Sequence, residues 1–580
     1  MNKSQIIIPG KTKHLAFLVI AVFSVMIGHS QIELSPKSET FYYTNPIITG
    51  MNPDPSICRV GDDYYLITST FGFYPGIPIY HSKDLVHWKL IGHGIHTPEQ
   101  LKLREEKSDQ LNIFAATIRY HKGTFYIIST NVGRKANDRN FVITAKDPSG
   151  PWSEAYYIKN APRIDPSLFF DDDGKVYYTG NDAPKNPTFD KQRNIWMQEI
   201  DPKTWELVGD KVIVVDPGNY YKGLALSGKE STALTFFEGP HVYKKDDIYY
   251  LMISHGGTFW DHAVSIWKSD AVFGPFEMDN NNPIVTNRDF SHDSYIHHTG
   301  HADMVQTQNN EWWMVLLGTR PYGGGYTNLG RETCLVPIDW SGTWPVVNSL
   351  GPKGRVMPIH RRPNLPNHPW PEDDVRDDFK NEKLNLYWNF MQPPTEKWWE
   401  LTGSSGKLKI NLRPEIIEVG VNPSFIGRRQ KHKNFTAITK MEFTPKAENE
   451  TAGMVITRDV SNQFKLVYTL KAGQQYLQLL RKDVVNINEN EPQERVVAEK
   501  QVNSKELYLK MEALEQLFTF SFSTDGKNWE TLAKDQDGRF LNFGLGMGKF
   551  TGTFIGMYAS SNGKKSNNFV LYDWFEYSGL

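Results

Sequence analysis

Three acidic residues and one histidine occupy matching positions in a repeated sequence pattern. They are Asp54, Asp165, Glu238 and His301, and each lies shortly before a pair of aromatic residues. Turn formation explains a single Asp before a proline, but it does not explain acids at one register of three repeats, because acids avoid apolar strand interiors unless they are paired or functional. Glycosidic cleavage needs two carboxyl groups in different protonation states, and a third carboxylate nearby raises the pKa of the acid. The residue types therefore indicate hydrolysis of glycosidic bonds, with no redox cofactor required.

The repeat that carries these residues is a turn followed by paired aromatic residues and then β-forming residues. The five aromatic pairs are Tyr64-Tyr65, Phe125-Tyr126, Tyr177-Tyr178, Tyr249-Tyr250 and Trp312-Trp313. Each copy is typical of a hairpin turn and a strand. Five such units across residues 45–356 predict a five-bladed β-propeller, and an array of β-sandwiches is the alternative. In a propeller, equal register means equal position around the axis, so the three carboxylates and the histidine are predicted to converge at one mouth of the channel.

A second domain is predicted after the repeats. Residues 357–372 are rich in proline and are typical of a linker, and short alternating strands resume over residues 373–580. The fold class is therefore all-β: a propeller over residues 31–356 and then a β-sandwich of the jelly-roll or concanavalin-like type. The sandwich either packs beside the propeller and shapes the rim of its pocket, or acts as an independent carbohydrate-binding module.

The first thirty residues have the pattern of a signal peptide. Lys3, Lys11 and Lys13 precede an apolar run over residues 15–27, and Gly28-His29-Ser30 offers small residues at a cleavage point. The run is too short for a comfortable transmembrane helix. The chain is therefore expected to be secreted or periplasmic, with residues 1–30 removed and no membrane insertion.

Charge and motifs exclude several other classes of function. The net charge is −2, from 64 basic and 66 acidic residues, so nucleic-acid binding by counterion release is not expected. The sequence has no glycine-rich phosphate loop that opens a helix and no serine nucleophile elbow. Its two cysteines, Cys58 and Cys334, either form one disulfide or stay as two buried thiols, and they do not support a cysteine-based zinc site.

A series of motifs spans the repeats and carries a resemblance to a known family. The motifs are Asn52-Pro53-Asp54-Pro55-Ser56-Ile57, Ser69-Thr70-Phe71, Tyr74-Pro75-Gly76, Ile164-Asp165-Pro166-Ser167, Glu238-Gly239-Pro240-His241, Gly300-His301-Ala302-Asp303, the run from Trp312 to Pro321, and Gly330-Arg331-Glu332-Thr333. In this order they resemble glycoside hydrolase family 43, especially its β-xylosidase and α-L-arabinofuranosidase members. The second domain resembles the C-terminal sandwich attached to many family 43 xylosidases, which favours packing beside the propeller.

The resemblance assigns roles to the three acids. It implies Asp54 as general base and Glu238 as general acid, with Asp165 orienting Glu238 and tuning its pKa. Because family members invert the anomeric centre, it also predicts a gap of roughly 6.5–9.5 Å between base and acid. The implied partner is a pentose-containing oligosaccharide or polysaccharide of the xylan or arabinan type, from which an exo-acting enzyme releases xylose or arabinose.

The resemblance also indicates the residues around the sugar. Arg331 would hydrogen-bond the sugar in the first subsite, and Phe71 would line that pocket. Phe114, in Phe114-Ala115-Ala116, stands where the family often has Trp-Ala-Pro, which leaves the choice between xylose and arabinose open. His301 lies where family members often hold an ion or water, so it is either a substrate-binding residue beside a structural calcium or a satisfied core histidine.

Two other functions fit the same layout. One is a non-catalytic, carbohydrate-binding propeller, although a binder has no need of three converging carboxylates. The other is a fructan-type glycosidase, which shares the five blades but retains configuration. Its nucleophile motif is expected as Asn-Asp-Pro-Asn, whereas this chain has Asn52-Pro53-Asp54-Pro55.

Overall fold

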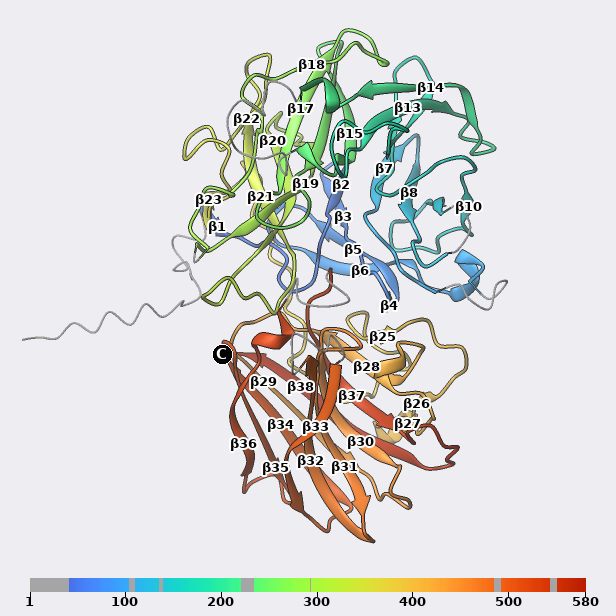
Figure 1. The fold of residues 1–580 in the computed structure, drawn as a ribbon, viewed down its shortest axis with the longest axis vertical. Helices are drawn as coiled ribbons and strands as arrows, with labels where there is room; N and C mark the ends of the chain where they lie inside the picture. The colour runs from blue at the N-terminus through green and yellow to red at the C-terminus, as the bar shows by residue number, and fades with distance from the viewer. Residues whose placement is uncertain are drawn as a thin grey trace, which may run out of the picture. The chain divides into compact units, whose positions relative to one another are not determined.

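The computed structural model describes residues 41–103, 110–134, 139–220, 234–292, 294–484, 492–542 and 550–580. The described chain is nearly all-β and forms a five-bladed β-propeller followed by a β-sandwich, so the predicted fold class is confirmed (Figure 1). The predicted signal peptide, residues 1–30, lies outside the described residues. Among the residues that are described, no helix has the length and apolar character needed to cross a membrane.

Each blade is a four-stranded antiparallel sheet whose strands follow one another along the chain. The strands, blade by blade, are β2 (Ser56–Val60), β3 (Asp63–Ile67), β5 (Gly76–Ser82) and β6 (Lys89–Ile95); β7 (Thr117–His121), β8 (Thr124–Thr130), β9 (Asn140–Ala145) and β10 (Tyr156–Tyr157); β11 (Ser167–Phe170), β12 (Val176–Asp182), β13 (Asn194–Ile200) and β14 (Leu207–Val215); β15 (Glu238–Lys245), β16 (Ile248–His255), β17 (Ala263–Ser269) and β18 (Glu277–Met278); and β19 (His297–Gln306), β20 (Trp312–Thr319), β21 (Glu332–Asp339) and β22 (Val346–Val347).

The first strand of every blade faces the central axis. Each of these strands contacts the first strand of the next blade, and β19 returns to contact β2, so the ring is closed. The aromatic pairs of the repeat lie on the second strands, where they fill the space between blades: Tyr64 of β3 and Trp313 of β20 belong to one core cluster. The hairpin repeat thus supplies both the inner ring and the packing between blades.

The chain before the first blade closes the propeller by pairing with the last blade. Strand β1 (Tyr42–Thr44) pairs with β23 (Ile359–Arg361), which lies inside the segment predicted as a linker. The backbone N–H of Ile47 donates to the carbonyl of Thr333 at 2.9 Å, and the N–H of Asn52 donates to the carbonyl of Arg331 at 2.9 Å. These bonds fix the start of the first blade, and with it Asp54, against the last blade.

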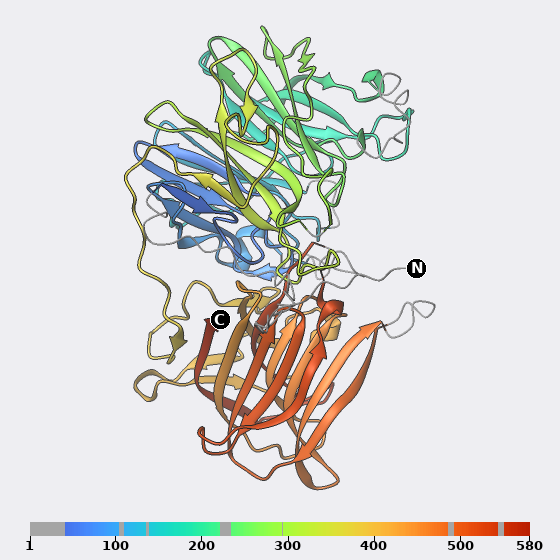
Figure 2. The ribbon, with the colours of Figure 1, turned by 90° about the vertical axis from the view of Figure 1, so that its left-hand side faces the viewer.

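The second domain consists of two facing eight-stranded sheets (Figure 2). One sheet contains β24 (Arg376–Asp377), β26 (Trp399–Leu401), β27 (Leu408–Asn411), β29 (Phe435–Glu442), β34 (Glu506–Leu514), β35 (Leu517–Ser523), β36 (Glu530–Asp537) and β38 (Phe569–Gly579). The other contains β4 (Phe73–Tyr74), β25 (Asn389–Met391), β28 (Ser424–Arg429), β30 (Thr451–Thr457), β31 (Gln463–Lys471), β32 (Gln474–Val484), β33 (Pro492–Gln501) and β37 (Phe554–Ser560).

A strand from the first blade belongs to a sheet of the sandwich. Strand β4 arises between β3 and β5, and Tyr74 of β4 pairs with Phe390 of β25. The Phe73 ring stacks on the Phe554 ring with centroids 3.7 Å apart, and the Arg429 Nε donates to the carbonyl of Met51 at 2.8 Å. Because the two domains share a sheet and an apolar cluster, the sandwich is part of the same packed unit as the propeller.

Both cysteines are buried free thiols, Cys58 on β2 and Cys334 on β21. Of the two alternatives left open by the sequence, the structure therefore has the thiol form. Burial raises the pKa of each thiol above its usual value, so neither is an activated nucleophile.

We expect Phe73→Ala to destabilise the joint between propeller and sandwich. Removing a buried, stacked phenylalanine leaves a cavity, which costs about 3–5 kcal/mol. The unfolding midpoint in denaturant measures the loss. Phe569→Ala, at a side chain with 41% exposure in the sandwich, is the matched control and should change stability by less than about 0.5 kcal/mol. Equal midpoints for Phe73→Ala and the wild type would show that the joint is not tightly packed.

Candidate active site

One position of the inner strands has a left-handed backbone in four of the five blades. The residues are Asp54 (φ 54°), Asp165 (φ 56°), Gly239 (φ 56°) and His301 (φ 49°). A residue other than glycine costs roughly 1–2 kcal/mol in this conformation, and Asp tolerates it better than most. The repeated conformation turns the chain as it enters the strand and so brings three of the predicted site residues to the same end of the channel.

Glu238 does not share this register, contrary to the prediction from sequence. In the first and fourth blades the hairpins close at Val60↔Asp63 and Lys245↔Ile248. Counting back equally from Val60 and Lys245 aligns Asp54 with Gly239. Glu238 lies one residue earlier, before a β-bulge that ends at His241. Its longer side chain and the bulge allow it to reach the site from a different backbone position.

Asp54 is buried and held as a carboxylate by hydrogen bonds. The Arg331 Nη1 donates to its Oδ1 at 2.7 Å, and the Ser69 hydroxyl donates to its Oδ2 at 2.7 Å. Burial by itself would raise the pKa of Asp54, but the Arg331 guanidinium, with smaller effects from His301 and the Ser69 bond, outweighs it and lowers the pKa. Asp54 is therefore ionised at neutral pH.

Glu238 is the first residue of β15 and has one cationic partner. The Arg193 Nη1 donates to its Oε2 at 2.7 Å, and the Arg193 guanidinium lies 4.9 Å from the centre of the Phe236 ring. Burial raises the pKa of Glu238, and repulsion from Asp54 adds to this, while Arg193 and Arg331 act in the opposite direction; the net effect is a raised pKa. Glu238 thus keeps a proton more readily than Asp54 does.

Asp165 lies two residues before β11 and is 6% exposed. Burial and then repulsion from Glu238 and Asp54 raise its pKa well above the usual range, and Arg193 and Arg331 counteract only part of this. The mutual repulsion shows that the structure brings Asp54, Asp165 and Glu238 together. Burial and this repulsion oppose ionisation of all three carboxyls, so a protonated carboxyl is favoured beside the ionised Asp54.

Three aromatic rings form a wall beside the carboxylates. The Phe71 ring lies 5.2 Å from the Phe114 ring and 5.7 Å from the Phe550 ring, centroid to centroid. The Arg331 guanidinium lies 5.5 Å from the centre of Phe71 and 5.4 Å from the centre of Phe550. Phe71 and Phe114 were predicted from sequence, and both lie here. Phe550 belongs to the second domain, which therefore contributes directly to the wall of the site.

His301 lies on the same mouth of the channel, with its Nδ1 3.9 Å from the Asp54 Oδ1. Burial lowers its pKa, so the imidazole is neutral and the contact is not an ion pair. Among the described residues, no group of three or more His, Cys, Asp or Glu side chains is placed to hold a metal ion. One imidazole beside a carboxylate already engaged by Arg331 does not form the oxygen-rich shell that calcium prefers, so a calcium here stays a prediction.

Two contributors to the site were missed by the sequence reasoning. Arg193 lies just before β13 and Phe550 in the loop before β37, and neither belongs to the repeated motif. The short pattern that identifies the acids is local to the hairpins, whereas these residues reach the site from a distant loop and from the other domain. No signal in the sequence separates them from ordinary loop residues.

Comparison with known proteins identifies the family of the chain. The family model described as "Glycosyl hydrolases family 43" matches residues 43–345, and the one described as "Beta xylosidase C-terminal Concanavalin A-like domain" matches residues 376–578. The chain is 40% identical over 557 residues to the "Non-reducing end alpha-L-arabinofuranosidase BoGH43B" of Bacteroides ovatus, which covers 96% of this chain and 98% of the relative. It is 39% identical over 537 residues to a "Xylosidase/arabinosidase" of Butyrivibrio fibrisolvens, covering 92% and 98%.

Solved structures show the same two-domain fold. "Bacteroides ovatus Xyloglucan PUL GH43B" superposes with a TM-score of 0.81 at 40% identity and covers 93% of this chain and 100% of its own. The xylan beta-1,4-xylosidase of Bacillus halodurans superposes with a TM-score of 0.81 at 30% identity and covers 92% and 99%. The likeness thus extends over both domains.

The opposed pKa shifts predict opposite effects of two isosteric variants on stability. Asp165 has a raised pKa in the folded state, so it weakens folding as pH rises above the value of about 3.9 expected in the unfolded chain. Asp54 has a lowered pKa, so its stabilising effect is present above that value and is lost as pH falls through the folded pKa. At neutral pH we therefore expect Asp165→Asn to raise the melting temperature and Asp54→Asn to lower it.

Melting temperatures measured from pH 3 to 8 check both signs, and each variant serves as the control for the other. The difference from wild type should shrink towards acid pH for both variants. A neutral-pH decrease of the melting temperature for Asp165→Asn would show that Asp165 is not the strained carboxyl of the trio.

Proposed function

The chain belongs to glycosyl hydrolases family 43 and is a glycoside hydrolase, and from this premise we propose that it releases single xylose or arabinose units from xylan- or arabinan-type chains with inversion. In this proposal Asp54 is the general base, Glu238 the general acid and Asp165 the residue that tunes the acid. The observation that carries it is the opposite direction of two pKa shifts: that of Asp54 is lowered and that of Glu238 is raised.

The two carboxyls would divide the reaction between them. Asp54, kept ionised by Arg331 and Ser69, accepts a proton from a water molecule as its oxygen attacks the anomeric carbon. Glu238 donates its proton to the departing glycosidic oxygen, so the bond breaks without a strongly basic leaving group. Each turnover leaves Asp54 protonated and Glu238 ionised, and exchange with solvent restores both.

Asp165 and the arginines would set the difference between base and acid. Repulsion between Asp165 and Glu238 disfavours two charges, so one proton stays on this pair when Asp54 is ionised. Arg193 bonds to Glu238 at 2.7 Å and limits how far its pKa rises. Arg331 bonds to Asp54 at 2.7 Å and lies beside the Phe71 ring, a position that suits it to contact a sugar in the first subsite.

The substrate class rests on the relatives and on the aromatic wall. The relatives carry the names of α-L-arabinofuranosidase, xylosidase and arabinosidase. The wall formed by Phe71, Phe114 and Phe550 offers apolar faces on which a sugar ring can pack. Because the second domain supplies Phe550, the mouth is bordered on that side, which favours recognition of a chain end over the middle of a polymer. Export guided by residues 1–30 is part of this proposal and places the enzyme where such polymers occur.

We expect the wild type to release 4-nitrophenol from an aryl β-D-xylopyranoside, an aryl α-L-arabinofuranoside or both. Glu238→Ala should lower this activity by about 100- to 10,000-fold, because the general acid is removed. Glu277→Ala, at the exposed glutamate of β18, is the matched control and should keep wild-type activity. A propeller that only binds sugar would show no turnover in any of the three proteins, and retained activity in Glu238→Ala would exclude Glu238 as the acid.

The configuration of the first-formed sugar provides an independent test of the mechanism. Direct attack of water activated by Asp54 inverts the anomeric centre, so hydrolysis of an aryl β-D-xylopyranoside should first yield the α-anomer of xylose. Proton NMR during the first minutes, before mutarotation, distinguishes the anomers. A β-anomer as first product would indicate a covalent intermediate, as in the fructan-type alternative, and would overturn the role of Asp54 as base.

A further inference from the structure

A second layer of polar residues lies directly below the carboxylates in the propeller channel. Side chains two residues apart on a strand point to the same face, so each inner strand presents one more residue to the axis after its site position. The five residues of this layer, one from each blade, are Ser56, Thr117, Ser167, His241 and Asp303. Two strand residues span roughly 6–7 Å, so this layer supports the catalytic mouth from beneath.

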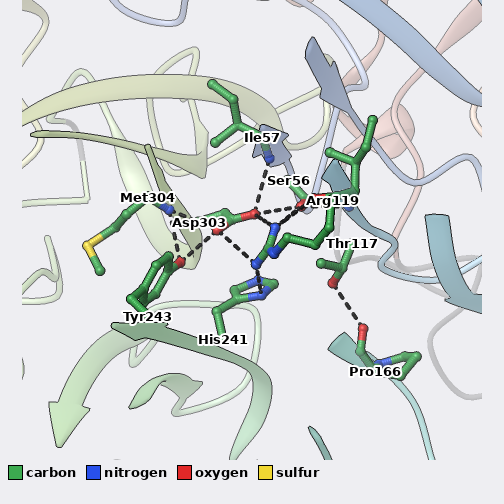
Figure 3. Close-up of polar contacts among 10 residues, drawn as sticks. Ser56, Ile57, Thr117, Arg119, Pro166, His241, Tyr243, Asp303 and Met304 are labelled. Carbon is green, nitrogen blue, oxygen red and sulfur yellow. Dashed lines mark hydrogen bonds and ion pairs between the residues drawn. The ribbon is translucent and has the colours of Figure 1, made fainter. Parts of the chain in front are cut away.

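Asp303 is the centre of this layer (Figure 3). Its carboxylate is fully buried and accepts hydrogen bonds from three other blades. The Ser56 hydroxyl donates to Oδ2 at 2.6 Å, the Arg119 Nη1 to Oδ2 at 2.7 Å and the Tyr243 hydroxyl to Oδ1 at 2.6 Å. Backbone N–H groups of Ile57 and Met304 donate at 3.1 and 2.9 Å. These bonds fill the acceptor capacity of a carboxylate.

Arg119 extends the network to the blade of the acid. Its Nη2 bonds to Asp303 Oδ1 at 3.3 Å and to His241 Nδ1 at 3.0 Å. A guanidinium can only donate, so the His241 Nδ1 is the acceptor and the imidazole is neutral. Burial is the main cause that lowers the pKa of His241, to about 3, which agrees with this assignment. One arginine thus joins β7 to β15 and β19.

Glu238 depends on the hydrogen bond between Arg119 and His241 more than the other site residues do. It is the first residue of β15, and the bulge between Glu238 and His241 leaves Gly239 and Pro240 outside the regular pairing with β16. Gly239 has φ 56°, a conformation that glycine adopts easily because it has no side chain. The backbone next to Glu238 is therefore weakly restricted by its own sequence. His241 is the first residue after the bulge, so the bond from Arg119 fixes the strand at the point where Glu238 leaves it.

The same layer also holds the strands of the other two acids. The Ser56 hydroxyl, two residues after Asp54, accepts from the N–H of Ile118 at 3.0 Å while it donates to Asp303. The Thr117 hydroxyl donates at 2.9 Å to the carbonyl of Pro166, the residue that follows Asp165 (Figure 3). The base, the acid and the tuning carboxyl are therefore joined through one set of bonds that runs across the axis.

We propose that Arg119 and Asp303 are positioning residues for the hydrolytic reaction, which fix the strand of Glu238 relative to the strand of Asp54. The inference rests on the proposed role of Glu238 as general acid. Within the described chain, their hydrogen bonds to other residues go to Ser56, Ile57, Ile118, His241, Tyr243 and Met304 and not to the three carboxyls of the site. A buried ion pair adds little net stability because desolvation offsets the attraction, but five blades that meet around a channel need a rigid centre, and displacement of a reacting group by about 1 Å can lower a rate by about 100-fold.

Arg119→Lys tests the proposal, because a lysine ammonium can still pair with Asp303 but cannot also reach His241 with a planar fork. The loosened strand should impair proton donation by Glu238. We expect kcat for a 4-nitrophenyl pentoside to fall by about 10- to 100-fold, whereas kcat for the 2,4-dinitrophenyl pentoside, whose leaving group needs little protonation, should fall by less than about threefold. KM should change little for either substrate.

The matched control is Arg362→Lys. Arg362 pairs with Asp84 at 2.8 Å, and both side chains are buried, with exposures of 8% and 1%. Neither residue belongs to the polar layer in the channel. This variant should lose a similar amount of thermal stability and leave the ratio of the two kcat values unchanged. If Arg119→Lys does not fold, His241→Ala replaces it. This variant keeps the Arg119–Asp303 pair and removes only the hydrogen bond from Arg119 to β15. It should change the ratio of the two kcat values in the same direction.

In a folded Arg119→Lys protein, an unchanged ratio of the two kcat values would overturn the proposal, whether both values stay the same or fall equally. A wild type that hydrolyses neither substrate would instead contradict the proposed function. In that case a crystal structure of Arg119→Lys still decides the positioning role, since a Glu238 carboxyl that has not moved relative to Asp54 would refute it.

Discussion

The repulsion among three closely placed carboxyl groups, of which Asp54 and Asp165 are buried, is the constraint on which the rest of this structure depends. Asp54, Asp165 and Glu238 meet at one end of the channel, where Asp54 raises the pKa of both other carboxyls and Glu238 raises that of Asp165. Arg193 and Arg331 offset only part of the rise in the pKa values of Asp165 and Glu238. The result is one stable carboxylate beside a pair that retains a proton, which is the protonation pattern that acid–base hydrolysis requires.

The radial arrangement of the blades provides this constraint with little special structure. A five-fold ring of equivalent strands delivers side chains from distant parts of the sequence to one axis, and the left-handed residues at Asp54, Asp165 and His301 direct the chain into each strand. Strain of this kind persists only where the surroundings hold the backbone firmly. Here the pairing of the first segment with the last blade and the bonds around Asp303 provide that support from the outside and from the axis.

The sandwich domain has a structural part and a part in the site. Strand β4 of the propeller completes one of its sheets, so the two domains bury a common apolar cluster that includes Phe73 and Phe554. From this fixed position Phe550 reaches the wall beside Arg331. A loosely tethered binding module could not hold an aromatic ring at a constant distance from Asp54 and Arg331, because a flexible linker does not restrain distances on that scale.

The sequence by itself determined the fold class and singled out Asp54, Asp165 and Glu238 as candidate acids, because both inferences depend on short-range patterns. Hairpin turns and paired aromatic residues repeat with the blades, and Asp54 and Asp165 stand at a fixed place in that repeat. The tertiary structure alone decided the rest. The one-residue offset of Glu238 became clear only once the structure showed where each hairpin closes and where β15 is bulged. Arg193, Phe550 and the Arg119–Asp303 pair act across blades or domains, and the direction of each pKa shift follows from charges brought together only by closure of the ring.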